Sequence, residues 1–254
     1  MCISGAAGAT VDLGSNTWYF ASSATGATAG SLSDSSGTLT YQTSSATANT
    51  MIWTYFSSQT LVSTGDSLTL NFTLSDSSVL NTAASLRIGL FNSGGTQVAN
   101  NLSGTIADSG FTNYTGDSAW VADHVSTTTS NIEYRSSTST TLWASAAFAS
   151  LGTGAGAALS ANTPYSGSLT LTKVSTGVQV AISLGGATFS YIDTSGKTSS
   201  YDTLSFFSTA ATDTLTLSNM SVTYAAAPEP GVVALLGAGA AMVGLPLWRR
   251  RRVF

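Results

Sequence analysis

The feature that most constrains the fold is a period-two alternation of apolar and polar residues along the middle of the chain. In the run 67–74 every second residue, from Leu68 to Leu74, is apolar, and the residues between are Ser, Thr and Asn. The run 178–184 repeats the pattern with Val178, Val180, Ile182 and Leu184. Successive side chains of a β-strand point to opposite faces. The first run therefore has one apolar face and one face of hydroxyl and amide groups, and the second has one apolar face and one with Gln179, Ala181 and Ser183. Such strands predict sheets packed face to face.

The same pattern, bounded by Gly-, Asn- and Asp-bearing turns, predicts further strands. Leu169 to Leu171 pairs with the run 178–184 in a hairpin, whose three-residue connection ends at Gly177 in a left-handed position. In the last strand the apolar phase shifts after Leu217, which predicts a bulge near Ser218 and Asn219. The remaining predicted strands are Thr50 to Phe56, Ser85 to Phe91, Asn131 to Arg135, Ala187 to Ile192, Thr203 to Phe207 and Thr214 to Tyr224.

These elements predict an all-β fold, an antiparallel β-sandwich or jelly roll, followed by one C-terminal transmembrane helix. No stretch before the tail has helical periodicity. One domain is expected over residues 11–224, large enough for a core without disulfides, and Cys2 is the only cysteine. Residues 225–254 form the tail.

Composition narrows the class of protein. Only 8% of the residues are charged, against roughly 25% in an ordinary soluble domain. Low charge with abundant Ser, Thr and Gly is typical of secreted β-rich proteins. Four of the eight basic residues are the terminal arginines, which leaves four against twelve acids and a charge near −8 for the rest of the chain. A nucleic-acid partner is excluded because it would require a basic stripe.

The tail has three parts in a fixed order. Pro228, Glu229 and Pro230 come first, then the apolar run 231–248, then four arginines, Arg249, Arg250, Arg251 and Arg252. As a helix the 18-residue run spans about 27 Å, the short end of what a bilayer core requires. The arginines would stay cytoplasmic by the positive-inside bias, so everything before Pro228 is expected across the membrane.

This tail resembles the PEP-CTERM sorting signal, on Pro228, Glu229, Pro230, the apolar run and the arginine cluster. The resemblance implies an exosortase-type enzyme as partner, transient residence in the bacterial inner membrane, processing near the Pro-Glu-Pro motif, and delivery to the cell surface or extracellular matrix. An exported protein needs a leader, and residues 1–10 are interpreted as the remnant of a signal peptide with cleavage near Ala9. The alternative is an ordinary single-pass anchor.

Three segments, 65–70, 86–91 and 217–222, resemble concanavalin-A-like (laminin-G-like) jelly rolls. The resemblance implies a two-sheet sandwich whose relatives often bind glycans, and many carry calcium held by carboxylates. Asn219 stands where such relatives often have an acid. This difference argues against a calcium site. We expect no cofactor, with calcium as the alternative that the resemblance leaves open.

Enzymatic chemistry finds little support. His124 is the only histidine, and no nucleophile-elbow pattern surrounds a serine, so an exposed loop histidine is favoured over a catalytic one. Glu133 is the only glutamate outside the tail, whereas glycoside hydrolysis needs two carboxylates at a set separation. The domain is predicted not to be an enzyme. The alternative is a secreted polysaccharide-active enzyme, either a glycoside hydrolase or a lyase, using aspartates distant in sequence.

A structural or adhesive matrix component is the favoured hypothesis, with glycan binding as one candidate mechanism and a purely structural role as the other. Aromatic rings would stack on sugars, and nearby polar groups would bond hydroxyls. The candidate set is Trp120, Asp117, Trp53, Tyr55 and Tyr134, with Trp143, Asp123 and Asn131 as further members. Trp120 is the first candidate because the run 116–120 is interpreted as a loop leading into a strand. The alternative is that the Trp and Tyr residues fill core or strand-face positions.

Overall fold

The computed structural model describes residues 8–26, 30–42, 49–77, 86–122, 129–209 and 214–228. Within them lie strands and two short 3-10 helices, η2 (Ser109–Asn113) and η3 (Ser145–Ala147). The strands are β1 (Ala9–Asp12), β2 (Trp18–Ser22), β3 (Ser31–Ser35), β4 (Thr38–Gln42), β5 (Thr50–Thr60), β6 (Ser67–Asp76), β7 (Leu86–Asn92), β8 (Leu102–Ser103), β9 (Thr115–Val121), β10 (Thr129–Arg135), β11 (Phe148–Ala155), β12 (Tyr165–Val174), β13 (Gly177–Leu184), β14 (Ala187–Asp193), β15 (Ser200–Ser208) and β16 (Thr214–Ala225).

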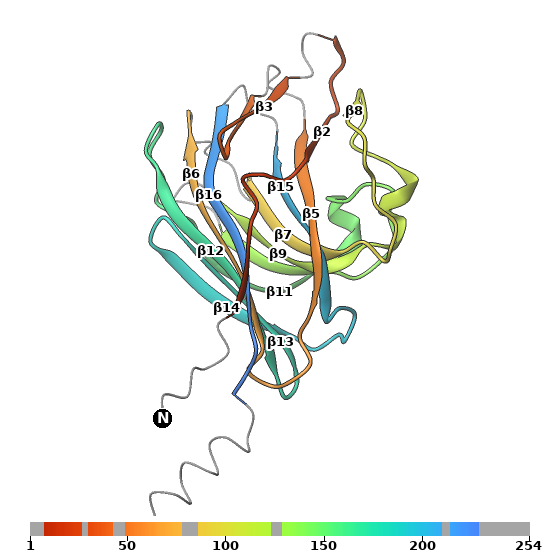
Figure 1. Cartoon of the computed structure of the whole chain (residues 1–254), viewed down its shortest axis with the longest axis vertical. Coiled ribbons are helices and arrows are strands. Elements are labelled where there is room, and N and C mark those ends of the chain that lie inside the picture. The colour runs from red at the N-terminus through yellow and green to blue at the C-terminus, as the bar shows by residue number, and fades with distance from the viewer. Residues whose placement is uncertain are drawn as a thin grey trace, which may run out of the picture.

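The strands form two eight-stranded sheets that face each other (Figure 1). Sheet A has the order β14-β13-β12-β6-β16-β4-β3, with β1 added beside β16. Sheet B has the order β11-β10-β9-β7-β15-β5-β2-β8. All neighbouring strands are antiparallel except β2 and β8. The all-β antiparallel sandwich predicted from the alternating runs is confirmed.

The main core fills the space between the sheets. The apolar side chains of β6, from Leu68 to Leu74, and those of β13 at alternate positions from Val178 to Leu184 are almost completely buried in it. The residues between them, mainly polar, face outward. From sheet B, Ile52, Ile88 and Phe206 enter the same cluster. The ring of Phe206 meets that of Phe72 edge-on at 5.6 Å between centroids, which joins the two sheets.

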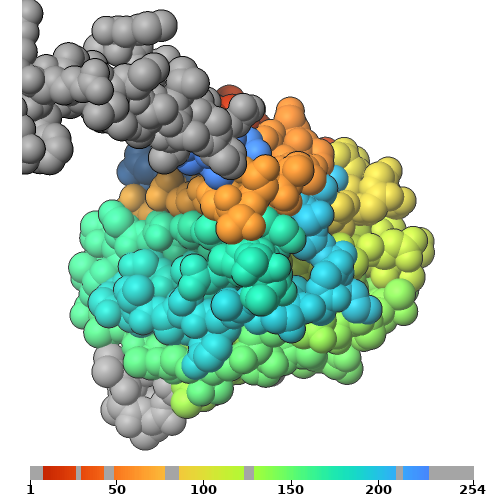
Figure 2. All heavy atoms as spheres, turned by 90° about the horizontal axis from the view of Figure 1, so that it is seen from below, coloured from red at the N-terminus to blue at the C-terminus, as the bar shows by residue number. Residues whose placement is uncertain are grey.

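A second apolar cluster lies on the opposite face of sheet B. Met51 and Trp53 of β5 and Phe91 of β7 contribute to it from the sheet. Val98 and Phe111, from the connection between β7 and β9, cover these side chains. Figure 1 shows the loops of the connection between β7 and β9 outside sheet B, beside its edge strand β8, and in Figure 2 this segment, drawn in yellow, projects from one side. The central strands of sheet B, such as β7 and β9, are therefore buried on both faces, which explains why their buried residues run without alternation.

The bulge predicted in the last strand is confirmed. The pairing of β16 with β6 shifts register between Ser218 and Ser221, and Asn219 adopts a positive φ of 52°. Before the bulge β16 pairs with β4, and after it with β1. The extra residue lets Met220 and Val222 return to the core face.

The hairpin between β12 and β13 is confirmed, but its turn differs from the prediction. Val174 pairs with Gly177, so the connection has two residues and the glycine belongs to the strand. Gly177 is absent from the described residues with positive φ. A Cβ at Gly177 would collide with the carbonyl oxygen of Asp193 on β14. Close approach of a neighbouring backbone, not turn geometry, therefore accounts for this glycine.

The sandwich is closed along one side where β11 of sheet B lies against β14 of sheet A. The ring of Phe189 lies over Gly154, and that of Tyr191 lies over Gly152, in positions where a Cβ would overlap ring atoms. The hydroxyl of Tyr191 also donates to the carbonyl oxygen of Thr153. Glycines on one edge thus make room for aromatic rings on the other.

The described domain extends slightly beyond the predicted bounds of 11–224. Ala9 and Thr10, which the sequence assigns to a leader remnant, belong to β1 and pair with Tyr224 and Thr223. At the other end β16 includes Ala225. The first and last described strands, β1 and β16, therefore lie side by side.

Candidate functional site

Arg135, the last residue of β10, holds two loops together. Its Nη1 donates to the carbonyl oxygens of Phe111 at 3.0 Å and Tyr114 at 2.7 Å. Its Nη2 donates to those of Ser139 at 2.7 Å and Thr141 at 3.3 Å. Burial lowers the pKa of Arg135 to about 10, so the guanidinium remains charged at neutral pH. Its planar fork therefore fixes η2 against the connection between β10 and β11.

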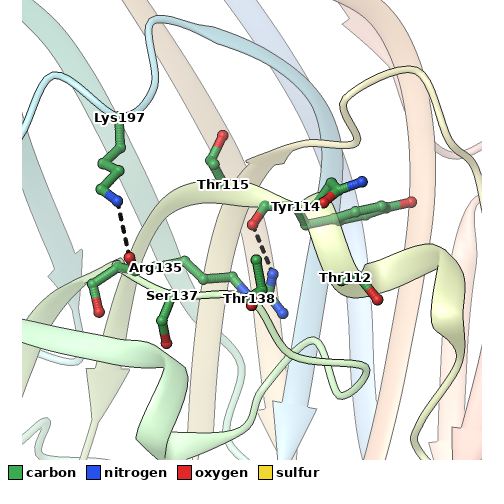
Figure 3. A pocket seen from close by; sticks show the side chains of 9 residues that line it. Thr112, Tyr114, Thr115, Arg135, Ser137, Thr138 and Lys197 are labelled. Carbon is green, nitrogen blue, oxygen red and sulfur yellow. Dashed lines mark hydrogen bonds between the residues drawn. The ribbon is translucent and has the colours of Figure 1, made fainter.

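Lys197 approaches the same place from the connection between β14 and β15. Asp193 organises this loop, because its carboxylate accepts hydrogen bonds from the backbone N–H and hydroxyl of Ser195 at 2.7 and 2.9 Å. The backbone N–H of Lys197 in turn donates to the Ser195 hydroxyl at 3.2 Å. Its Nζ reaches the carbonyl oxygen of Ser136 at 3.0 Å. Figure 3 shows this side chain extending toward the end of β10.

These loops enclose a hollow of about 220 Å³ (Figure 3). Its walls are Thr112, Asn113, Tyr114, Thr115, Arg135, Ser136, Ser137, Thr138 and Lys197. Every side chain of the lining is polar, and none is acidic. Asn113 and Thr138 are exposed, and neither side chain hydrogen bonds to another described residue. The hollow thus offers amide and hydroxyl groups beside two cations.

A second polar hollow of about 440 Å³ lies on the other sheet, at the bulge of β16. Its walls are Asp12, Gly14, Ser15, Ser36, Gly37, Asn219 and Met220. Ser36 and Asn219 both have φ near 52°, a conformation that costs a residue with a side chain about 1 kcal/mol or more. One carboxylate oxygen of Asp12 is already hydrogen-bonded within the loop, since its Oδ1 accepts from the N–H of Gly14 at 2.9 Å.

This second hollow contains Asn219, at the position where concanavalin-A-like proteins often have an acid near a calcium site. Asn219, in the position where an acid was considered, turns its Nδ2 toward the hydroxyl of Thr73 at 3.2 Å. Asp12 is the one carboxylate of the lining, whereas calcium takes six to eight oxygens, usually with several carboxylates. Within the described ranges no group of three His, Cys, Asp or Glu could hold a metal ion. The residues that line this hollow do not fit calcium.

The predicted sugar-stacking residues Trp53 and Tyr55 serve the second core instead. Trp53 is fully buried, and its Nε1 donates to the carbonyl oxygen of Val98 at 2.9 Å. The hydroxyl of half-buried Tyr55 accepts from the N–H of Val98 at 2.7 Å and contacts the hydroxyl of Tyr114 at 2.8 Å. Both side chains fasten a loop to sheet B, and burial argues against Trp53 as a sugar platform.

Trp120 does not lie in a loop, as its sequence context indicated, but inside β9. Its side chain is 6% exposed, and its Nε1 donates to the hydroxyl of Ser118 at 3.1 Å. The guanidinium carbon of Arg87 lies 3.7 Å from the centre of its ring. Trp143 is buried too, with its ring stacked on Phe148 at 5.6 Å. The core-filling alternative accounts for these tryptophans.

Asp117 also lies inside the molecule, on the face of β9 that looks into the sandwich. The hydroxyl of Tyr201 donates to its Oδ2 at 2.7 Å, while its Oδ1 has no hydrogen-bond partner among the described residues. Burial, with a smaller contribution from nearby Asp193, raises the pKa of Asp117 to about 8. Tyr134 is half-buried and pairs with Asp117 across the strands. Neither residue lines a hollow described above.

Several predicted residues fall outside the described part of the chain. These are Asp123, His124, Glu229, Pro230, the apolar run 231–248 and Arg249, Arg250, Arg251 and Arg252. Pro228 is described and exposed, and just before it the N–H of Ala227 donates to Asp66 at 2.9 Å. Among the residues with described positions, no helix is long and apolar enough to cross a membrane.

No protein-family model and no curated protein matches the sequence. The fold does match solved structures. Basic winged bean lectin in complex with Tn-antigen superposes with a TM-score of 0.53 at 10% identity, covering 86% of this chain and 98% of the lectin. The Emp47p carbohydrate recognition domain (TM-score 0.50, 12% identity) and peanut lectin with a nine-residue peptide (0.50, 11%) each cover 87% of this chain and 98% of their own. The fold is a lectin-like jelly roll.

Sequence reasoning missed the residues that build the first hollow. Arg135 and Lys197 are two of the four basic residues outside the terminal arginines, and no motif in the sequence marks Asn113 or Thr138 as site residues. The one available signal was the small number of charged residues. In such a chain each basic residue outside the terminal cluster is a candidate for a structural or binding role. Nothing local indicated that residues 113, 135 and 197 meet.

Proposed function

We propose that this protein is an exported glycan-binding protein, with a β-sandwich that binds carbohydrate and a C-terminal tail that directs it to the cell surface or extracellular matrix. The lectin-like jelly roll is the observation that carries the proposal. Among its structural neighbours, the winged bean protein is named a lectin and was solved with Tn-antigen, and the Emp47p domain is named a carbohydrate recognition domain.

The hollow between Arg135 and Lys197 is the proposed site. Sugars present many hydroxyls, and specific sites pair these with a few well-placed polar groups. The free amide of Asn113 and the hydroxyl of Thr138 supply donors and acceptors on a wall held by Arg135. The hollow of about 220 Å³ is smaller than the roughly 300–1,000 Å³ typical of drug-sized ligands, so it suits one sugar residue of a chain.

Binding is favoured over hydrolysis by the positions of the carboxylates. A glycosidase needs two carboxyl groups that reach the same glycosidic bond. Asp117 and Asp193 do lie near each other, but they are 0% and 3% exposed inside the sandwich, where no sugar can reach them. We therefore propose that the domain is not an enzyme.

The double variant Asn113→Ala/Thr138→Val is expected to weaken glycan binding about 10- to 30-fold. Each lost hydrogen bond is worth about 1 kcal/mol, and 1.4 kcal/mol corresponds to a tenfold change in affinity. The measurement is calorimetric titration of the full chain with polysaccharides selected on a glycan array. Ser15→Ala in the second hollow is the matched control and should bind normally. An array without any binding would overturn the proposed function, and loss of binding only in Ser15→Ala would move the site to β16.

The tail is tested separately, in a bacterium that contains an exosortase. Wild-type chain is expected to lose its tail and leave the inner membrane fraction, whereas Glu229→Ala should stay there at full length. The reason is that the sorting motif resembles the one such enzymes process. Immunoblots of membrane and surface fractions measure both species, and deletion of the exosortase is the control. Equal release of both chains would contradict the sorting role.

A further inference from the structure

The hollow between η2 and the end of β10 is positively charged in an otherwise acidic protein. The chain has a net charge of −4, and its basic residues outside the terminal cluster are Arg87, Arg135, Lys173 and Lys197. Two of these four line the hollow, and the lining includes no acidic residue. Neither forms an ion pair with a carboxylate among the described residues. The local field therefore favours an anion, against the charge of the whole chain.

The two cations differ in what they offer a ligand. Four carbonyl oxygens occupy both terminal nitrogens of Arg135, which is 1% exposed, and its buried Nε has no hydrogen-bond partner. Arg135 thus contributes its positive charge to the hollow but has no accessible donor for a ligand. Lys197 is exposed, and its ammonium group makes one hydrogen bond, to the carbonyl oxygen of Ser136. An ammonium has three donors, so two remain for a ligand at the rim.

We propose that this hollow binds the carboxylate of an acidic sugar, such as a uronic acid residue in a polysaccharide, with Lys197 as the residue that selects the acid. One accessible ammonium suits a singly charged group. The neighbouring amide of Asn113 and the hydroxyl of Thr138 are placed for the hydroxyls of the same sugar ring. The inference rests on the proposed function and specifies its ligand class.

The test compares acidic oligosaccharides with their own carboxyl-reduced forms. Oligomers of galacturonate, glucuronate and mannuronate are titrated into the full chain by calorimetry, each beside the neutral oligomer made by reducing its carboxyl groups. The acidic form of at least one is expected to bind about 5- to 10-fold more tightly, the size of one charge-assisted contact at a partly exposed site. The preference should shrink as salt rises, because salt screens the contact.

Variants of the lysines identify the residue. Lys197→Gln is expected to reduce the preference for the acid to less than twofold, while Lys197→Arg keeps most of it. Lys173→Gln on β12 removes the same charge away from the hollow and should leave the preference unchanged. Because Lys197 is exposed, its variant should unfold at the wild-type temperature.

The outcomes separate the two ideas. If acidic and reduced oligomers bind equally, or if Lys197→Gln keeps the preference, the acid-binding inference is overturned and the proposed glycan binding stands. If neither form of any oligomer binds, and the array is also blank, both are overturned.

Discussion

Replacing Arg135 with methionine is expected to lower the free energy of unfolding by about 3 kcal/mol or more and to abolish binding in the hollow. The guanidinium satisfies the carbonyl oxygens of Phe111, Tyr114, Ser139 and Thr141, two of them at 2.7 Å. Methionine is unbranched and has no donor, so the carbonyls of Tyr114 and Ser139 would lose the guanidinium at about 1–3 kcal/mol each. The carbonyls of Phe111 and Thr141 would keep the backbone N–H groups of Tyr114 and Ala144. Partial entry of water into the loosened loops keeps the total below the sum.

Chemical denaturation measures the loss, and amide hydrogen exchange locates it. Faster exchange is expected in η2 and in the connection between β10 and β11, while β6 and β12 in the main core should exchange as before. Arg135→Lys is the matched control, because it retains the charge but cannot reach four carbonyls with one ammonium. It should therefore recover only a small part of the stability. A methionine variant as stable as wild type would show that the fork does not hold these loops.

Some parts of this fold were predictable because their signals are local. The strands β6 and β13 have one face on the core and one in solvent. The alternation of apolar and polar residues, as at Leu68, Leu70, Val178 and Val180, therefore predicts which face is buried. The bulge of β16 was visible for the same reason, as a change of phase near Asn219.

The outer layer of sheet B was not predictable from local patterns. In β9 all residues after Thr115 are buried, because loops cover the face that carries Trp120. A strand buried on both faces has no alternation, and the polar run beginning at Gly116 therefore resembled a loop. The same loops cover Trp53, which the sequence predicts as a surface aromatic. Its hydrogen-bond partner, the carbonyl oxygen of Val98, is 45 residues away, so no local pattern indicates that Trp53 is buried.

The candidate site also depends on contacts between residues that are far apart in the sequence. Lys197 approaches Arg135 because its Nζ donates to the carbonyl oxygen of Ser136, the next residue after Arg135. Ser136 and Lys197 are 61 residues apart in the sequence. Their approach depends on the chain crossing from β14 in sheet A to β15 in sheet B, and on the turn that Asp193 holds. No spacing rule encodes a contact of this kind. What the sequence does show is that each cation is rare and so is worth locating.

The second large effect concerns pH, through the buried carboxyl of Asp117. Its folded-state pKa of about 8 lies well above the ordinary value of 3.8, chiefly because burial between the sheets disfavours the charged form. The hydrogen bond from Tyr201 opposes this shift, and nearby Asp193 adds to it. Between these two pKa values the folded state binds the proton and the unfolded state does not. Stability should consequently fall as pH rises from about 4 to about 8, and level off above that.

The variant Asp117→Asn is expected to flatten this dependence. An amide has the shape of the protonated carboxyl and no charge to bury, so it carries no penalty at high pH. One pKa unit corresponds to about 1.4 kcal/mol, which makes the wild-type loss on the order of several kcal/mol, as an upper bound. At pH 8 the variant should be the more stable protein, and near pH 4.5 the two should be similar.

Urea unfolding of the full chain between pH 4.5 and 8.5 provides the measurement. Asp34→Asn on exposed β3 removes the same charge at the surface and should retain the wild-type slope. An Asp117→Asn chain whose stability falls with pH as steeply as that of the wild type would show that this carboxyl is not protonated in the folded protein. A flat profile would show that one buried aspartate, set between Tyr201 and Asp193, limits how well the two sheets hold together at neutral pH.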